Sequence, residues 1–210
     1  MVGVLALLPS VALAKSAGDI VMRIRGLGVI PFEGGPGNGG TAVVGGDTSL
    51  DTDLTPEVDF SYFITDNIAA ELILGTTIHQ ASLVGSTLGN LDLGSVRLLP
   101  PTLNLQYHLM PKADFSPYVG VGINYTIFYD ESGGNGNGQG VIVTNIDYEN
   151  SFGYGFQVGM DWKIDDRWHL NVDLKKIFLD TKINVNRGTI IVDDADVDPL
   201  IIGLGVGYRF

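Results

Sequence analysis

Apolar and polar residues alternate along much of this 210-residue chain, and the alternation is clearest at the C-terminal end. From Leu200 to Phe210, one set of alternate positions is apolar throughout, and the other set is mostly glycine with Arg209 near its end. Successive side chains of a strand point to opposite faces, so this segment predicts a strand with one apolar face and one small or polar face. Its length and pattern suit a tilted strand that crosses a bilayer.

Similar alternation recurs along the chain and predicts an all-β fold, an eight-stranded antiparallel transmembrane β-barrel. The predicted strands are residues 19–29, 51–64, 68–78, 96–109, 117–129, 151–162, 168–181 and 198–210. Short connections (residues 65–67, 110–116 and 163–167) alternate with long ones (residues 30–50, 79–95, 130–150 and 182–197). Short periplasmic turns and long extracellular loops are typical of outer-membrane barrels, so both termini are expected on the periplasmic side.

The composition fits a barrel better than a soluble domain. Hydrophobic residues make up 45% of the chain despite a net charge of −12, and there are 29 glycines and no cysteine. The absence of cysteine removes disulfides, thiol catalysis and thiolate metal sites. An acidic chain without clustered Lys and Arg is not expected to bind nucleic acid. No cofactor is predicted.

The first fourteen residues predict a signal peptide, and residues 15–210 the barrel domain. An apolar run, residues 2–8, precedes the small-x-small triplet Ala12-Leu13-Ala14, and the mature chain is expected to begin near Lys15. No Lys or Arg precedes the apolar run, which suggests that the true start lies upstream. The alternative is a buried N-terminal helix.

Four segments together resemble the OmpW family of small outer-membrane barrels. These segments are Thr65-Asp66-Asn67-Ile68-Ala69-Ala70-Glu71-Leu72, Leu99-Pro100-Pro101-Thr102-Leu103, Pro117-Tyr118-Val119-Gly120-Val121-Gly122-Ile123-Asn124-Tyr125-Thr126 and the ending Gly207-Tyr208-Arg209-Phe210. The resemblance covers essentially the whole chain after the signal peptide. It implies a hydrophobic conduit that small apolar molecules enter from outside and leave sideways into the membrane. Tyr208 and Phe210 match the C-terminal signal by which such barrels are recognised for assembly.

Parity along the strands assigns residues to the barrel interior. Leu27, Val29 and Ile73 point inward toward the outer half of the wall and are the predicted apolar pocket. Six charged residues also point inward and are predicted to act as a gate or plug: Arg23, Arg25, Asp59, Glu71, Asp173 and Lys175. A narrow barrel has little room for water, so these charges must pair. The expected pairs are Arg23 and Arg25 with Asp59, and Lys175 with Glu71 or Asp173.

Three other features are read as structural rather than chemical. The glycine-dense segments 34–40 and 133–140 are predicted outer loops, since no helix or Lys-Ser pair follows to form a phosphate site. The acidic residues Asp193, Asp194, Asp196 and Asp198 lack the spacing of a calcium loop, so no metal site is predicted. His79, His108 and His169 fall at different ends of the barrel, which argues against an enzyme.

The sequence therefore predicts an outer-membrane barrel of a Gram-negative bacterium that admits small hydrophobic molecules. Its expected partners are outer-membrane lipids and lipopolysaccharide, the barrel assembly machinery and small hydrophobic solutes. The alternative is a non-transporting barrel that acts through its acidic loops as a surface receptor or envelope-stabilising protein.

Overall fold

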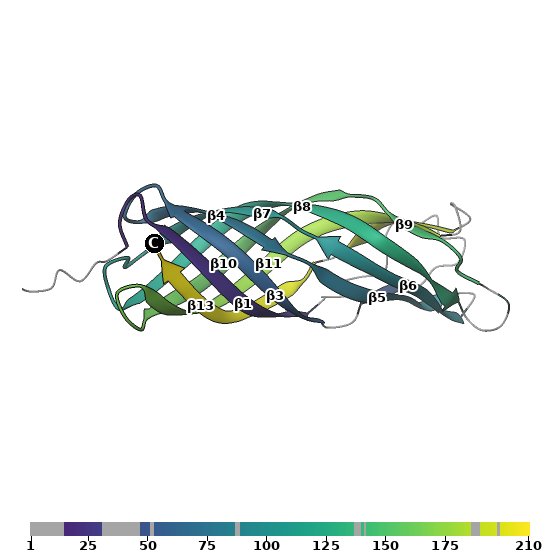
Figure 1. Ribbon diagram of the computed structural model, residues 1–210. Helices are drawn as coiled ribbons and strands as arrows, with labels where there is room; N and C mark the ends of the chain where they lie inside the picture. The colour runs from purple at the N-terminus through teal and green to yellow at the C-terminus, as the bar shows by residue number, and fades with distance from the viewer. Residues whose placement is uncertain are drawn as a thin grey trace, which may run out of the picture.

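The computed structural model describes residues 15–30, 47–50, 53–86, 89–136, 140, 142–185, 190–196 and 198–210 (Figure 1). Within this part of the chain every regular element is a β-strand, and no helix is long and apolar enough to cross a membrane. The predicted signal peptide and the glycine-dense segment 34–40 lie outside the described residues.

Eight strands form a closed antiparallel ring. They are β1 (Ile20–Ile30), β3 (Asp53–Phe63), β4 (Ile68–Gly75), β7 (Thr102–His108), β8 (Phe115–Gly136), β10 (Ser151–Lys163), β11 (Trp168–Val185) and β13 (Leu200–Arg209). Each pairs with the next, and β13 pairs back onto β1 from Arg209 opposite Val21 to Leu200 opposite Ile30. The predicted eight-stranded barrel is confirmed.

One end of the barrel carries the three short turns, at residues 64–67, 109–114 and 164–167, and is here named the turn end. At the opposite end, the loop end, the sheet continues past the ring (Figure 1). The added strands are β2 (Asp47–Leu50), β5 (Thr77–Ser86), β6 (Gly89–Leu99), β9 (Ile146–Tyr148) and β12 (Ile190–Asp196), together with the long ends of β8 and β11.

The predicted long loops at residues 79–95, 130–150 and 182–197 are therefore wrong in part, since much of each is strand, and the predicted loop 30–50 contains β2. A β-bulge explains the first error. Leu91 and Leu93 are buried, and so are Val96 and Leu98, so the buried face changes from odd to even positions between them. The pairing of β6 shifts register at Gly94, whose φ is +106°. A bulge adds one residue and so interrupts the alternation that a sequence shows.

Two strands predicted as continuous are divided in the structure. The predicted strand 68–78 is broken at Thr76 between β4 and β5, and the predicted strand 96–109 is broken at Pro100 and Pro101 between β6 and β7. Proline has no N–H to donate to a sheet, which accounts for the second break. The two breaks face each other in the barrel wall, between the pairs Ile73–Thr102 and Thr77–Leu98.

The predicted face of each barrel strand agrees with burial. In β1, Arg23, Arg25, Leu27 and Val29 are buried in the lumen, and Ile20, Ile24 and Ile30 are exposed on the outer wall. Lumenal glycines make room for the larger side chains. A Cβ at Gly159 would lie 2.3 Å from the Oη of Tyr118, and a Cβ at Gly122 would lie 1.8 Å from the Oδ1 of Asn104.

At the turn end, the aromatic side chains of Trp168 in β11, Tyr208 in β13 and Phe210 directly after β13 pack against each other. The ring of Tyr208 lies 5.0 Å from that of Trp168 and 4.9 Å from that of Phe210, and Arg167 donates to the Tyr208 hydroxyl at 2.8 Å. In the same turn Asp165 accepts hydrogen bonds from the N–H groups of Arg167 and Trp168, which lower its pKa. The role of Tyr208 and Phe210 in assembly stays a prediction.

The substitution Gly159→Ala is expected to lower the free energy of unfolding by about 1–3 kcal/mol, because the added methyl would overlap the rigid ring of Tyr118. Gly26→Ala is the matched control, since a Cβ there meets nothing within 4 Å. Urea unfolding of both variants in lipid vesicles, followed by tryptophan fluorescence, measures the difference. Equal midpoints for the two variants would contradict the packing described here.

Candidate functional site

Nine charged side chains fill the lumen between the turn end and the middle of the barrel. They include all six residues predicted as a gate or plug, and every one is buried. This lumen ion cluster consists of Lys15, Arg23, Arg25, Glu57, Asp59, Glu71, Asp161, Asp173 and Lys175.

Arg25 is the centre of the lumen ion cluster. Its Nε lies 2.7 Å from Glu57 Oε1, and its Nη2 lies 2.7 Å from Asp59 Oδ2 and 3.1 Å from Glu71 Oε1. Its Nη1 lies 3.5 Å from Asp173 Oδ2. The four carboxylates come from three different strands, β3, β4 and β11, so a single guanidinium links opposite parts of the wall.

Arg23, one step nearer the turn end, repeats this arrangement. Its Nη1 lies 2.8 Å from Asp59 Oδ1, and its Nη2 lies 3.0 Å from Asp161 Oδ2. The same Nη1 donates to the Ser61 hydroxyl at 2.7 Å. The Lys15 ammonium also contacts Asp161.

Lys175 closes the cluster on the side of the loop end. Its Nζ lies 2.7 Å from Glu57 Oε2 and 3.2 Å from Asp173 Oδ1. The predicted contacts of both arginines with Asp59, and of Lys175 with Asp173, are present in the structure. The predicted alternative of Lys175 with Glu71 is replaced by Glu57, because the Glu71 carboxylate lies against Arg25 instead.

Neutral donors satisfy the remaining carboxylate oxygens. Tyr118 donates its hydroxyl to Asp173 at 3.0 Å, and Gln157 donates to the same oxygen at 2.8 Å. Asn104 donates to Glu71 and Asn171 to Asp161, each at 2.8 Å. Buried ions are tolerated only when they are paired and hydrogen-bonded in this way. The cluster therefore fills its section of the lumen with ion-paired groups, of which Arg25 Nε, Asp59 Oδ2 and Asp173 Oδ1 make ion contacts without hydrogen-bond geometry.

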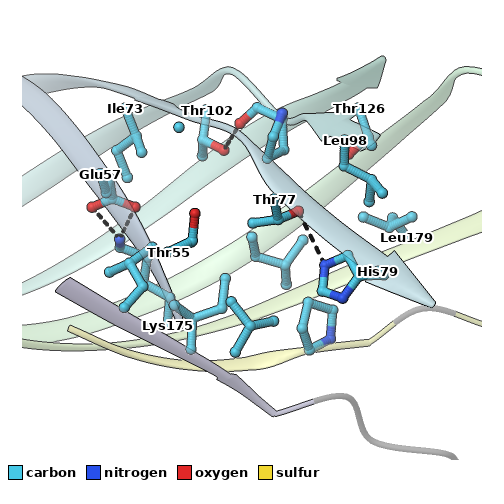
Figure 2. A pocket seen from close by; sticks show the side chains of 17 residues that line it. Thr55, Glu57, Ile73, Thr77, His79, Leu98, Thr102, Thr126, Lys175 and Leu179 are labelled. Carbon is cyan, nitrogen blue, oxygen red and sulfur yellow. Dashed lines mark hydrogen bonds and ion pairs between the residues drawn. The ribbon is translucent and has the colours of Figure 1, made fainter. Parts of the chain in front are cut away.

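Directly beyond Lys175 the lumen opens into an apolar cavity (Figure 2). Its volume is about 80 Å³. By the same measure a single water molecule needs roughly 10–15 Å³. Leu27, Val29 and Ile73, the three predicted pocket residues, all line it. The other apolar lining residues are Gly75, Leu98, Pro100, Ile177, Leu179, Pro199 and Ile201.

The polar residues around the cavity direct their polar atoms into the protein. The hydroxyls of Thr55 and Thr102 donate to backbone carbonyls at 2.6 and 3.0 Å, and that of Thr126 donates to Asn124 at 2.6 Å. Thr77 and His79 bond each other at 3.0 Å (Figure 2). The hydroxyls are thereby engaged, and the surface of the cavity is almost entirely apolar.

The wall of the cavity contains the paired strand breaks. Gly75 and Pro100, which both line the cavity, lie between the last pair of β4 with β7 and the first pair of β5 with β6. The carbonyl of Pro100 accepts instead from the side chains of Thr102 and Asn124. At this point the β4–β5 and β6–β7 segments are not held together by the sheet ladder.

Sequence reasoning missed three members of the lumen ion cluster. Parity places Glu57 on the same face as Asp59, two residues further on, and places Asp161 on the face opposite to its outward-facing neighbour Trp162. Both were therefore recognisable as inward-facing residues. Lys15 gives no such signal, because it precedes β1 and reaches the lumen through a turn.

The residues considered for catalysis or metal binding do not converge. His79 lines the cavity, whereas His108 contacts Gln106 and Ser116, and His169 lies 3.2 Å from the carbonyl of Gly207. Among the described residues, no three His, Asp or Glu side chains are grouped to hold a metal ion. The side chains of Asp193, Asp194 and Asp196 lie outside that part, and Asp198 accepts from the Leu179 N–H at 3.3 Å.

A sequence profile described as the OmpW family matches residues 16–210. The chain belongs to this family. An uncharacterized outer-membrane protein of Sinorhizobium fredii, y4mB, is 44% identical over 90% of this chain and 79% of its own length. Outer membrane protein W of Salmonella typhimurium is 35% identical over 97% of this chain and 94% of its own length. Both relatives are named as outer-membrane proteins.

Two further relatives extend the comparison. The crystal structure of the outer membrane protein OprG from Pseudomonas aeruginosa matches with a TM-score of 0.79 and 27% identity, over 94% of this chain and 98% of that one. The dibenzothiophene metabolism operon protein PahQ of Pseudomonas aeruginosa is 25% identical over 81% of this chain and 78% of its own length. The protein is thus an outer-membrane β-barrel of the OmpW family.

The substitution Arg25→Met is expected to lower the free energy of unfolding by about 3–5 kcal/mol, because it leaves four buried carboxylates short of their shared cation. Arg97→Met is the control: Arg97 pairs with Asp130 at 3.0 Å, but both side chains are exposed, so a cost of about 0–1 kcal/mol is expected. Urea titration of both variants tests this. An Arg25→Met barrel as stable as the Arg97→Met barrel would show that the cluster contributes nothing to stability.

Proposed function

We propose that this barrel admits small apolar molecules through the outer membrane. The observation that carries the proposal is the cavity, which is apolar on its surface and bounded below by the lumen ion cluster. A solute reaching the cavity through the loop end would meet a mostly apolar surface, whereas an ion would meet only Lys175 and Glu57, which are already paired with each other. The name of the relative PahQ refers to the metabolism of dibenzothiophene, an apolar aromatic compound, which agrees in chemical class.

The path beyond the cavity is proposed to lead sideways. Below the cavity, paired charges occupy the lumen and would have to be separated for a solute to pass along the axis, at a large desolvation cost. At the side, the break at Gly75 and Pro100 offers a stretch of wall without ladder hydrogen bonds. Release between these two segments into the membrane is the route with fewer interactions to break.

The orientation follows the usual arrangement of such barrels. Short turns face the periplasm and longer connections face outward, which would place the turn end on the periplasmic side and the cavity toward the cell exterior. The described start of the chain and Phe210 both lie at the turn end, where the N–H of Phe210 donates to Ile20.

The substitution Ile73→Asp is expected to slow uptake of an apolar solute, because it places a charge in the cavity wall. Ile73→Leu keeps the volume and the apolar character and serves as the control. The measurement is dibenzothiophene uptake by intact cells with an undamaged lipopolysaccharide leaflet, since apolar solutes cross plain phospholipid vesicles unaided.

Equal uptake by cells with Ile73→Asp, Ile73→Leu and no barrel at all would exclude the cavity as a conduit. It would favour instead a surface role for the acidic connections, tested by changing Asp193, Asp194 and Asp196 to Asn. Deleting residues 133–140 would be a poor test of that role, because Gly133 and Gly136 are paired with β6 in the sheet.

The sideways route is tested with a reversible crosslink, because the chain has no cysteine of its own. In the double variant Gly75→Cys, Pro100→Cys, oxidation would tie the two segments together, and uptake is expected to fall under oxidation and recover on reduction. Ala69→Cys, Gln106→Cys links the same strand pair lower in the barrel, where the ladder is intact. Uptake that is insensitive to oxidation of the first pair, once the crosslink is verified by mass, would rule out exit at this break.

A further inference from the structure

Lys15 stands at the start of the described chain, yet its side chain is only 5% exposed. Its ammonium contacts Asp161, which also binds Arg23, and lies 5.8 Å from the centre of the Phe63 ring. Phe63 belongs to an apolar cluster with Val21 and Ala69 at the turn end. A lysine side chain would normally remain in water, so its position inside the lumen needs a structural cause.

The cause is a turn encoded by the sequence just before β1. The N–H of Asp19 donates to the carbonyl of Ser16 at 3.0 Å, and Gly18 occupies the third position of this turn with φ at +93°. A turn of this kind requires a positive φ at its third residue, which glycine adopts without strain. The N–H of Gly18 also donates to Phe63 at 2.8 Å, so the turn is fixed to the barrel.

Two further hydrogen bonds hold the chain before Gly18 in place. The N–H of Ser16 donates to Asp19 Oδ2 at 2.9 Å, and the N–H of Ala17 donates to Asp66 Oδ1 at 3.1 Å. Asp66 lies in the first short turn and pairs there with Lys112 at 2.8 Å. Together these bonds reverse the chain and direct Lys15 back into the barrel.

Lys15 contributes a positive charge that the lumen ion cluster otherwise lacks. The cluster holds five carboxylates, and without Lys15 it would hold three cations, Arg23, Arg25 and Lys175. Lys15 is the fourth, and it lies beside Asp161, the carboxylate nearest the turn end. An uncompensated buried carboxylate is costly, and without Lys15 the Asp161 carboxylate would keep Arg23 as its one contacting cation, beside the neutral amide of Asn171.

This placement distinguishes between two of the small-x-small triplets after which a signal peptidase could cleave. Ala12-Leu13-Ala14 and Ala14-Lys15-Ser16 both have small residues at the positions that the peptidase reads. Cleavage after Ala14 retains Lys15, whereas cleavage after Ser16 discards it. We propose that cleavage occurs after Ala14 and that Lys15, the first residue of the mature chain, acts as a stopper that closes the lumen at the turn end.

The cleavage site is tested by the intact mass of the full-length barrel purified from outer membranes. The mass of the chain 15–210 is expected. The mass of the chain 17–210 would overturn the proposal, because that chain lacks the stopper.

The stopper is tested by thiol labelling, with Lys15→Cys and Lys112→Cys as single cysteines in the otherwise cysteine-free barrel. Lys112 lies at the same end and pairs with Asp66, but its side chain is 65% exposed. A water-soluble maleimide is expected to label position 15 at least about tenfold more slowly than position 112 in the folded barrel, and equally fast in urea. Equal rates in the folded barrel would overturn the proposal.

A stability measurement guards against an effect of the cysteine itself. Lys15→Met is expected to shift the urea midpoint downward, Lys15→Arg to restore it by keeping the charge, and Lys112→Met to leave it unchanged. A Lys15→Met barrel with the wild-type urea midpoint would show that the Lys15 side chain does not stabilise the barrel. None of these readouts depends on solute uptake, so they stand or fall independently of the proposed function.

Discussion

The structure depends on the neutralisation of charge inside a barrel too narrow for a water column. Arg25 is the clearest example of this constraint. Its guanidinium contacts four carboxylates and is excluded from solvent. Such a group is stable only if every partner is held in position, which requires strands from several parts of the chain. The lumenal glycines serve the same end: Gly203 and Gly205 lie against the Arg25 side chain, where a larger residue would displace it.

The ion cluster and the cavity are two results of one strand pattern. On β1 the inward positions pass from Arg23 and Arg25 to Leu27 and Val29, and on β11 from Asp173 and Lys175 to Ile177 and Leu179. On both strands the inward positions change from charged to apolar in the direction of the loop end. The charged section of the lumen therefore meets the apolar section at the Lys175–Glu57 pair. Both residues of this pair also line the cavity.

Alternation in the sequence was sufficient to predict the barrel, its eight strands, the three short turns and the inward position of most site residues. It failed where backbone geometry departs from a regular strand. The bulge at Gly94 exchanged the two faces of β6, and Pro100 and Pro101 divided a strand that reads as continuous. The partners of Lys175 were only partly predicted, because parity gives the face of a residue but not its height relative to a distant strand. Lys15 could not be predicted, since a turn rather than a strand places it.

The pairing of β1 with β13 has a consequence for how the molecule forms. The first and last strands of the ring become neighbours only when the whole chain is present, so the barrel is dominated by contacts between residues far apart in sequence. Arg23 and Arg25 on β1 have partners on the nearby strands β3 and β4, but also Asp161 on β10 and Asp173 on β11. The complete set of ion pairs therefore requires that the first strands and the last strands of the ring are all in place.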